Sequence, residues 1–185
     1  MGSSSGSREP SGAPRVSKRR AQNHGQTQAQ NARALPPGLH LVATPIGNLG
    51  DISARAIEVL GSVDAVACED TRMTGGLLAK LGLSAALVPY HDHNADRAGP
   101  AIIERLKRGE IVALVSDAGT PLISDPGFRL VQTAIAEGIQ VVSVPGPSAA
   151  LAALTASGLP TDRFLFAGFL PSREKARRDA LSALG

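Results

Sequence analysis

Short apolar runs recur along the chain after a polar N-terminal stretch, and segments with helical spacing separate most of them. Five runs rich in Val, Ile, Leu and Ala predict strands. A strand whose two faces are both covered reads as a continuous apolar run, so these strands are predicted to be buried. They occupy residues 39–43, 65–68, 86–88, 111–115 and 141–144.

Between the runs, apolar residues recur at intervals of three and four, which predicts helices at residues 55–60, 100–108, 130–137 and 147–157. Gly109, Gly138 and Gly158 follow three of these segments, as is typical of helix ends. Strands that alternate with helices predict an α/β fold with a mostly parallel five-stranded sheet flanked by helices.

Three regions follow from these patterns. Residues 1–37 are rich in Ser, Gln, Gly, Asn and Arg, which predicts a disordered basic tail or a leader added for expression. Residues 38–160 are the N-terminal α/β domain. A further strand-like run at 164–169 and a basic helical segment at 173–184 predict that residues 161–185 start an incomplete second α/β domain.

Charge and cysteine content exclude some classes of protein function. The net charge of the 185 residues is +3, but residues 1–37 hold six basic residues and one acidic residue, so the remainder carries −2. A generally basic, nucleic-acid-binding surface is therefore not expected. Cys68 is the only cysteine, which excludes an intrachain disulfide and fits a reducing cytoplasm. No apolar run approaches the roughly 20 residues of a membrane span.

Polar loops follow the predicted strands at their carboxyl ends, the edge at which open α/β sheets bind ligands. The most informative is V-S-D-A-G-T-P-L-I-S-D-P-G at residues 115–127, whose carboxylates, hydroxyls and prolines suit a shaped pocket better than a plain turn. P-G-P-S at 145–148 starts a helix whose free N–H groups can hold an anion.

Three other loops each leave two interpretations open. T-P-I-G-N-L-G-D at 44–51 brings backbone close to a ligand, or is a tight turn before a helix capped by Asp51 or Ser53; it lacks G-x-G-x-x-G and a Walker lysine. E-D-T-R at 69–72 is an ion-paired turn or a site. H-D-H-N at 91–94 is an exposed loop or faces substrate, and a metal is not expected because alternate residues point apart.

Taken together, T-P-I-G-N-L, E-D-T-R, H-D-H-N, S-D-A-G-T-P-L-I-S-D-P-G, P-G-P-S-A and G-L-P-T-D-R-F-x-F-x-G-F-L-P resemble the ribosomal RNA small subunit methyltransferase I family, in the tetrapyrrole methylase superfamily. The resemblance covers residues 39–185. It implies an S-adenosylmethionine-dependent, cytoplasmic enzyme that methylates a cytidine ribose 2′-hydroxyl in 16S ribosomal RNA of the small subunit. It also implies two α/β domains, a cofactor cleft between them and a homodimer when full-length.

The implied reaction gives candidate roles to residues of the loops and of the helical segment at 173–184. Asp70 and His91 are candidate bases, and Asn48, Arg72, His93 and Arg177 are expected on the substrate side. The expected cofactor-binding residues are Pro45, Gly47, Asp117, Ala118, Gly119, Thr120, Pro121, Pro145, Gly146 and Ser148.

The family continues beyond Gly185, so a truncated chain is expected. Two alternatives remain open. One is a tetrapyrrole or other small-molecule methyltransferase of the same fold. The other is an inactive fragment that only binds RNA.

Overall fold

The computed structural model describes residues 1–2 and 35–184. The account below concerns residues 35–184. The tail predicted at residues 1–37 therefore lies outside the described residues except at its two ends. At the second end, Leu35 packs against the core and the Pro36 carbonyl accepts a hydrogen bond from His40 Nε2 at 2.9 Å.

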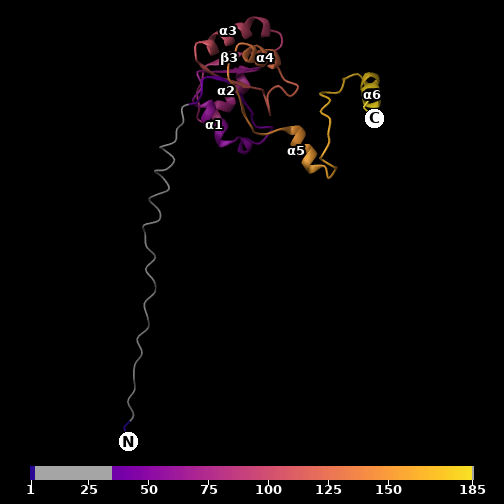
Figure 1. Ribbon diagram of the computed structural model, residues 1–185. Coiled ribbons are helices and arrows are strands. Elements are labelled where there is room, and N and C mark those ends of the chain that lie inside the picture. Colours follow the sequence, from indigo (N-terminus) through magenta and orange to yellow (C-terminus); the bar gives the residue numbers. More distant parts are fainter. Residues whose placement is uncertain (3–34, 185) are drawn as a thin grey trace. The chain divides into compact units, whose positions relative to one another are not determined.

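Five parallel strands form one sheet in the order β3-β2-β4-β1-β5, which confirms the predicted architecture. Figure 1 labels the helices α1 to α6 and strand β3. The strand bounds agree with the predicted runs to within one residue. They are β1 Gly38–Val42, β2 Ala65–Cys68, β3 Leu87–Pro89, β4 Ile111–Val115 and β5 Val141–Val144.

Helices cover both faces of the sheet. Their bounds are η2 Leu49–Asp51, α1 Ala54–Leu60, α2 Thr71–Lys80, α3 Ala95–Lys107, α4 Phe128–Ala136, α5 Ala149–Ala156 and α6 Glu174–Ser182. One buried cluster joins α3 and α4 to the sheet, and a second joins α1 and α2 to its other face. None of the described helices is long and apolar enough to cross a membrane.

The central strand β4 shows why two cores form. Val112 and Leu114 belong to the cluster under α3 and α4, while Ala113 and Val115 belong to the cluster under α1 and α2. Successive side chains of a strand point to opposite faces, so one apolar run supplies both cores. All four residues are buried, which explains the continuous apolar pattern.

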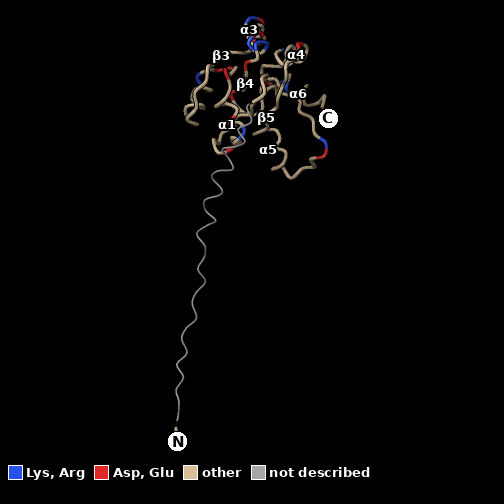
Figure 2. The backbone as a smooth tube through the Cα atoms, turned by 60° about the vertical axis from the view of Figure 1, so that its left-hand side comes forward, with Lys and Arg blue, Asp and Glu red and all other residues tan. Residues whose placement is uncertain are grey.

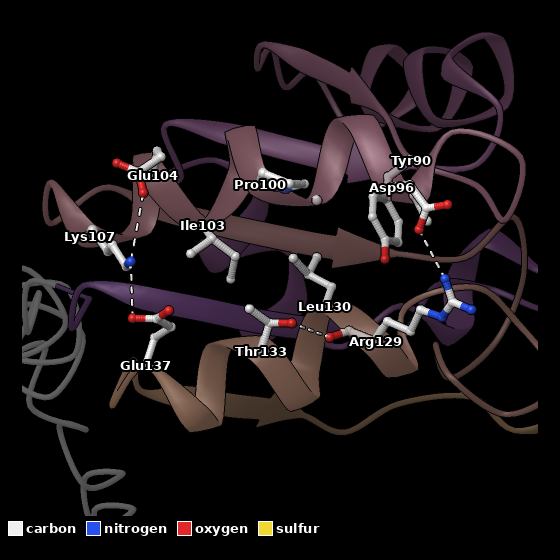
Figure 3. Close-up of a pocket in the computed structure, with 12 residues that line it drawn as sticks. Tyr90, Asp96, Pro100, Ile103, Glu104, Lys107, Arg129, Leu130, Thr133 and Glu137 are labelled. Atoms are coloured by element: carbon white, nitrogen blue, oxygen red, sulfur yellow. Dashed lines mark hydrogen bonds and ion pairs between the residues drawn. The ribbon is translucent and has the colours of Figure 1, made fainter.

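A groove of about 370 Å³ runs between α3 and α4, on the face away from α1 and α2 (Figure 3). An ion pair joins the helices near each end: Lys107 Nζ lies 3.0 Å from Glu137 Oε2, and Arg129 Nη1 lies 3.0 Å from Asp96 Oδ1. None of the predicted site residues lines this groove. It belongs to the packing of the two helices.

Two helices differ from the sequence-based expectation. Helix α2 was not predicted, because Gly75 and Gly76 at its centre have poor helix propensity. The prediction that a helix starts at Pro100 is wrong, since α3 begins five residues earlier at Ala95. Pro100 therefore lies inside a helix, where it removes one backbone N–H donor.

The prediction of a strand at residues 164–169 is wrong. These residues adopt no strand or helix, and all of them are exposed. A strand needs a neighbour for its backbone hydrogen bonds, and no described strand pairs with this run. The helix predicted at 173–184 is confirmed as α6.

Candidate functional site at the carboxyl edge of the sheet

The strand order creates a topological switch point at β4. From β1 the chain crosses to β2 and on to β3, whereas from β4 it crosses to β5 in the opposite direction. Because parallel crossovers share one hand, the loop after β4 and the loops after β1 and β2 lead to opposite faces. Ligand crevices of open α/β sheets form at such points, at the carboxyl ends of the strands.

Hydrogen bonds connect the three loops that follow β1, β4 and β5. Thr44 and Gly119 exchange two backbone bonds, with Thr44 N donating to Gly119 O at 2.9 Å and Gly119 N donating to Thr44 O at 3.0 Å. The Thr44 hydroxyl donates to Ser116 O at 3.2 Å. The Thr120 hydroxyl donates to Pro147 O at 3.0 Å. Three loops that are far apart in sequence therefore form one rigid rim.

Backbone strain and close backbone approach occur in the same rim. Gly119 has φ +82°, and a Cβ on Gly146 would lie 2.9 Å from Ala43 Cβ. Leu122 and Ser124 have φ of 71° and 64°, values that residues with a Cβ rarely adopt. Such conformations cost of order 1–3 kcal/mol each and concentrate at functional sites. The strain therefore marks the loop at 116–127 as a candidate site.

Two cavities flank the loop that follows β4. The first has a volume of about 330 Å³ and is here called the cofactor-side cavity, because four residues predicted from the sequence to bind a cofactor line it. It is lined by Ala118, Gly119, Thr120 and Ser148, together with Ile46, Ile123, Asp125, Ala149, Ala150, Phe166 and Phe169. The second, here called the α2 cavity, has a volume of about 360 Å³. It is lined by Pro45, Gly47, Arg72 and Asp117, together with Thr44, Leu49, Met73, Gly76, Leu77 and Lys80.

Asp70 is the N-cap of α2 and binds Arg72 through both carboxylate oxygens. Arg72 N donates to Asp70 Oδ1 at 2.8 Å, Nε donates to the same oxygen at 3.1 Å, and Nη2 donates to Oδ2 at 2.7 Å. These hydrogen bonds lower the pKa of Asp70 to about 2. Asp70 is therefore ionised at neutral pH and is a weak proton acceptor.

Carboxylates accumulate at this edge. Burial, followed by the charges of Asp117, Asp125 and Asp92, raises the pKa of Glu69. Burial raises the pKa of Asp125 as well, and the charge of Asp117 adds to the shift against a hydrogen bond from Ser116. Burial is the main cause of both shifts, and the neighbouring carboxylates add a smaller one.

The loop after β3 places His91 beside His93, with ring centroids 6.0 Å apart. The His91 backbone N–H donates to Asn94 Oδ1 at 2.9 Å, and Asn94 Nδ2 donates to Pro89 O at 3.0 Å. The Nδ1 atom of His91 is buried and lacks a hydrogen-bond partner within residues 35–184. In the same part of the chain, no group of three or more His, Cys, Asp or Glu side chains is placed to hold a metal.

The structure brings the expected site residues together in two sets and leaves others apart. Eight of them line the two cavities. Asn48 instead caps η2, where its Oδ1 accepts from Gly50 N at 3.0 Å. Ser53, one of the two proposed caps of α1, accepts from Ala56 N at 3.0 Å. The expected residues that line neither cavity are Asn48, Asp70, His91, His93, Pro121, Pro145, Gly146 and Arg177.

Sequence reasoning missed cavity residues on two segments. Met73, Gly76 and Lys80 line the α2 cavity from a helix that was not predicted. Phe166 and Phe169 line the cofactor-side cavity from the run that was predicted to be a strand. The four-residue spacing from Arg72 through Gly76 to Lys80 was the available signal for the first set.

Two solved methyltransferase structures share this sheet architecture. Uroporphyrin-III-C-methyltransferase from Thermus thermophilus has a TM-score of 0.51 at 28% identity, over 67% of this chain and 53% of that chain. A cobalt precorrin-4 methyltransferase has a TM-score of 0.52 at 21% identity, over 64% of this chain and 49% of that chain, and shows the fold alone.

The family model for tetrapyrrole (corrin/porphyrin) methylases matches residues 38–185, and the chain belongs to this family. "Ribosomal RNA small subunit methyltransferase I" of Mesorhizobium japonicum is 60% identical over 160 residues, 86% of this chain and 54% of that protein. The protein of the same name from Escherichia coli is 54% identical over 157 residues, 85% of this chain and 55% of that protein. These relatives confirm the resemblance drawn from the loops. The chain spans about half their length.

Proposed function

We propose that this chain carries the S-adenosylmethionine-binding half of an enzyme that methylates a cytidine 2′-hydroxyl in 16S ribosomal RNA. The main support is the identity of 54–60% to proteins named as small-subunit ribosomal RNA methyltransferases. The interlocked, strained loops at the carboxyl edge support the same reading, because they are the segments that carry the resemblance. The small ribosomal subunit and a second copy of the chain are the proposed partners.

The cofactor-side cavity fits the chemistry of S-adenosylmethionine. Its volume of about 330 Å³ is in the range of small-molecule sites, and apolar side chains such as Ile46 and Phe166 suit an adenine ring. Asp125 supplies a carboxylate for a cationic sulfonium group. The side chain of Ser148 makes no cap bond at the start of α5, which leaves backbone N–H groups for the cofactor's carboxylate.

When bound, the cofactor supplies an electrophilic methyl group, and the ribose hydroxyl must lose a proton to attack it. A positioned base accelerates such a step by about a hundred- to ten-thousandfold. The pKa of about 2 makes Asp70 a weak base, and its contacts suit it to holding Arg72 in place. We therefore favour the other candidate base, His91, as the proton acceptor.

The decisive experiment maps ribose methylation in ribosomal RNA from cells with and without the full gene. The proposal predicts one cytidine 2′-O-methyl group that disappears with the gene and returns with a plasmid copy. The 28% identity to a uroporphyrin-III-C-methyltransferase favours tetrapyrrole methylation as the second candidate. Unchanged ribosomal RNA together with methyl transfer to a porphyrinogen would establish that candidate instead.

A further inference from the structure

One face of α2 presents two cations separated by a glycine. Arg72, Gly76 and Lys80 follow one another at four-residue intervals, so they lie on the same side of the helix, and all three line the α2 cavity. At 1.5 Å per residue, Arg72 and Lys80 are about 12 Å apart along the helix axis. Met73, a residue that is 59% exposed, lines the cavity beside them.

The two central glycines of α2 have different surroundings. A Cβ on Gly75 would lie 3.5 Å from Leu87 Cδ1, so this glycine faces β3. A Cβ on Gly76 would meet no atom within 4 Å. Gly76 therefore leaves open space at the cavity wall that no packing requirement explains, although it weakens the helix.

The cations at this wall are only partly neutralised, because Asp70 pairs with Arg72 and not with Lys80. Lys80 forms no ion pair within residues 35–184. The side chain of Arg72 is 90% exposed and uses Nε and Nη2 to bind Asp70, which leaves Nη1 for another anion. Among the described residues, Asp117 is the only carboxylate that lines the cavity.

We infer that this face of α2 is the docking surface for the sugar–phosphate backbone of the RNA strand that is methylated. Lys80 and Arg72 contact separate phosphates, because they lie at opposite ends of α2 and Asp70 holds the Arg72 guanidinium at the N-terminal end. The backbone passes over Gly76, and Met73 offers an apolar contact to a ribose or base. This inference rests on the proposed function and deepens it, since it names the residues that hold the substrate.

The two cations on α2 can bind RNA by individual contacts, whereas the folded part of the chain has no overall positive charge that would attract RNA. Outside residues 1–37 the chain carries a net charge of −2, and Figure 2 shows acidic and basic positions interspersed along the described fold. RNA affinity must then come from a few well-placed contacts. Each phosphate contact contributes about 0.7 to the slope of log K against log salt for a single strand.

The test measures binding of a labelled 16S ribosomal RNA transcript to the chain by fluorescence anisotropy at several salt concentrations. Lys80→Gln should weaken binding several-fold at low salt and reduce the salt slope by about 0.7, whereas Lys80→Arg should restore both. Arg97→Gln is the charge-matched control, because Arg97 is exposed on α3 at the other face of the sheet. Equal affinities and slopes for Lys80→Gln and Arg97→Gln would overturn the inference, as would a wild-type chain that binds no RNA.

Variants of the two central glycines test whether RNA binding needs the open space at Gly76 as well as the charges of Arg72 and Lys80. Gly76→Ala and Gly75→Ala should both raise the melting temperature, because alanine favours a helix and neither Cβ meets an atom closer than 3.5 Å. Only Gly76→Ala should weaken RNA binding, and Gly76→Leu should weaken it further. If both Gly76 variants bind RNA as tightly as Gly75→Ala does, the backbone does not pass over this position.

Methylation mapping in cells distinguishes failure of this inference from failure of the proposed function. A full gene carrying Lys80→Gln should give reduced cytidine methylation, while the gene carrying Arg97→Gln should match wild type. If wild type methylates and Lys80→Gln methylates equally well, only the docking surface is wrong. If wild type leaves the ribosomal RNA unmethylated, the proposed function itself is wrong.

Discussion

Gly119 offers the sharpest test of whether the loop after β4 binds the cofactor. Its φ of +82° is held by the two backbone hydrogen bonds with Thr44, and it lines the cofactor-side cavity. In Gly119→Ala, a residue with a Cβ would have to adopt the left-handed backbone conformation, which costs about 1–2 kcal/mol. It would also approach Ile46 Cγ2 at 3.3 Å, and Ile46 lines the same cavity.

The expected effect on affinity follows from this strain. If the whole cost of about 1–2 kcal/mol appears in the binding equilibrium, the dissociation constant for S-adenosylmethionine rises roughly 5- to 30-fold. Isothermal titration calorimetry on wild type and variant measures it directly. Thermal unfolding measured alongside gives the loss of global stability.

Gly82→Ala is the matched control. Gly82 has φ +70° in the turn after α2, where a Cβ would meet no atom within 4 Å. It carries the same conformational cost but lines neither cavity. Gly82→Ala should therefore lose thermal stability and keep wild-type cofactor affinity, whereas Gly119→Ala should lose cofactor affinity. Equal cofactor affinity in the two variants would refute the assignment of this loop.

Three further predictions concern stability and the rim. Leu114→Ala should destabilise the fold by about 2–5 kcal/mol in denaturant titrations, because Leu114 is 1% exposed and truncation leaves a cavity; a loss below about 1 kcal/mol would contradict its place in the core. The Asp70 carboxyl has a pKa of about 2, against 3.8 unperturbed, so its contribution to stability is complete above pH 4 and disappears as pH falls from 3.8 towards 2. Asp70→Asn should flatten unfolding-against-pH curves in that window, and an unchanged acid profile would count against the Arg72 contact. Thr120→Val removes the bond to Pro147 O and should weaken S-adenosylmethionine binding by roughly 2- to 12-fold in calorimetry, equivalent to about 0.5–1.5 kcal/mol; wild-type affinity would show that the bond does not shape the site.

The strands were predictable because burial on both faces leaves a plain signal. A run such as that at β4 must be apolar at every position, whichever core each side chain enters. Helix α2 was not predictable on propensity, because Gly75 and Gly76 disfavour a helix that packing against β3 nevertheless stabilises. The strand predicted at 164–169 failed for the converse reason, since local pattern cannot supply a pairing partner.

The loops were recognisable as candidate sites from their composition, but the sequence did not show which loop residues line which cavity. Consecutive residues such as Asp117 and Ala118 line different cavities, a fact that depends on where the neighbouring loops cross. Asp70 illustrates the same limit. In sequence it was equally a base or an ion-paired turn, and only the position of the Arg72 side chain decides that it is held as an ionised cap.

Local pattern alone therefore established the α/β class, the parallel sheet and the edge at which the candidate site lies, because burial and turn chemistry act over a few residues. Contacts between residues distant in sequence established the rest. The Thr44–Gly119 bridge, the Thr120–Pro147 bond and the open wall at Gly76 each need two segments to meet. Such meetings depend on strand order, and the order β3-β2-β4-β1-β5 is a property of the folded chain as a whole.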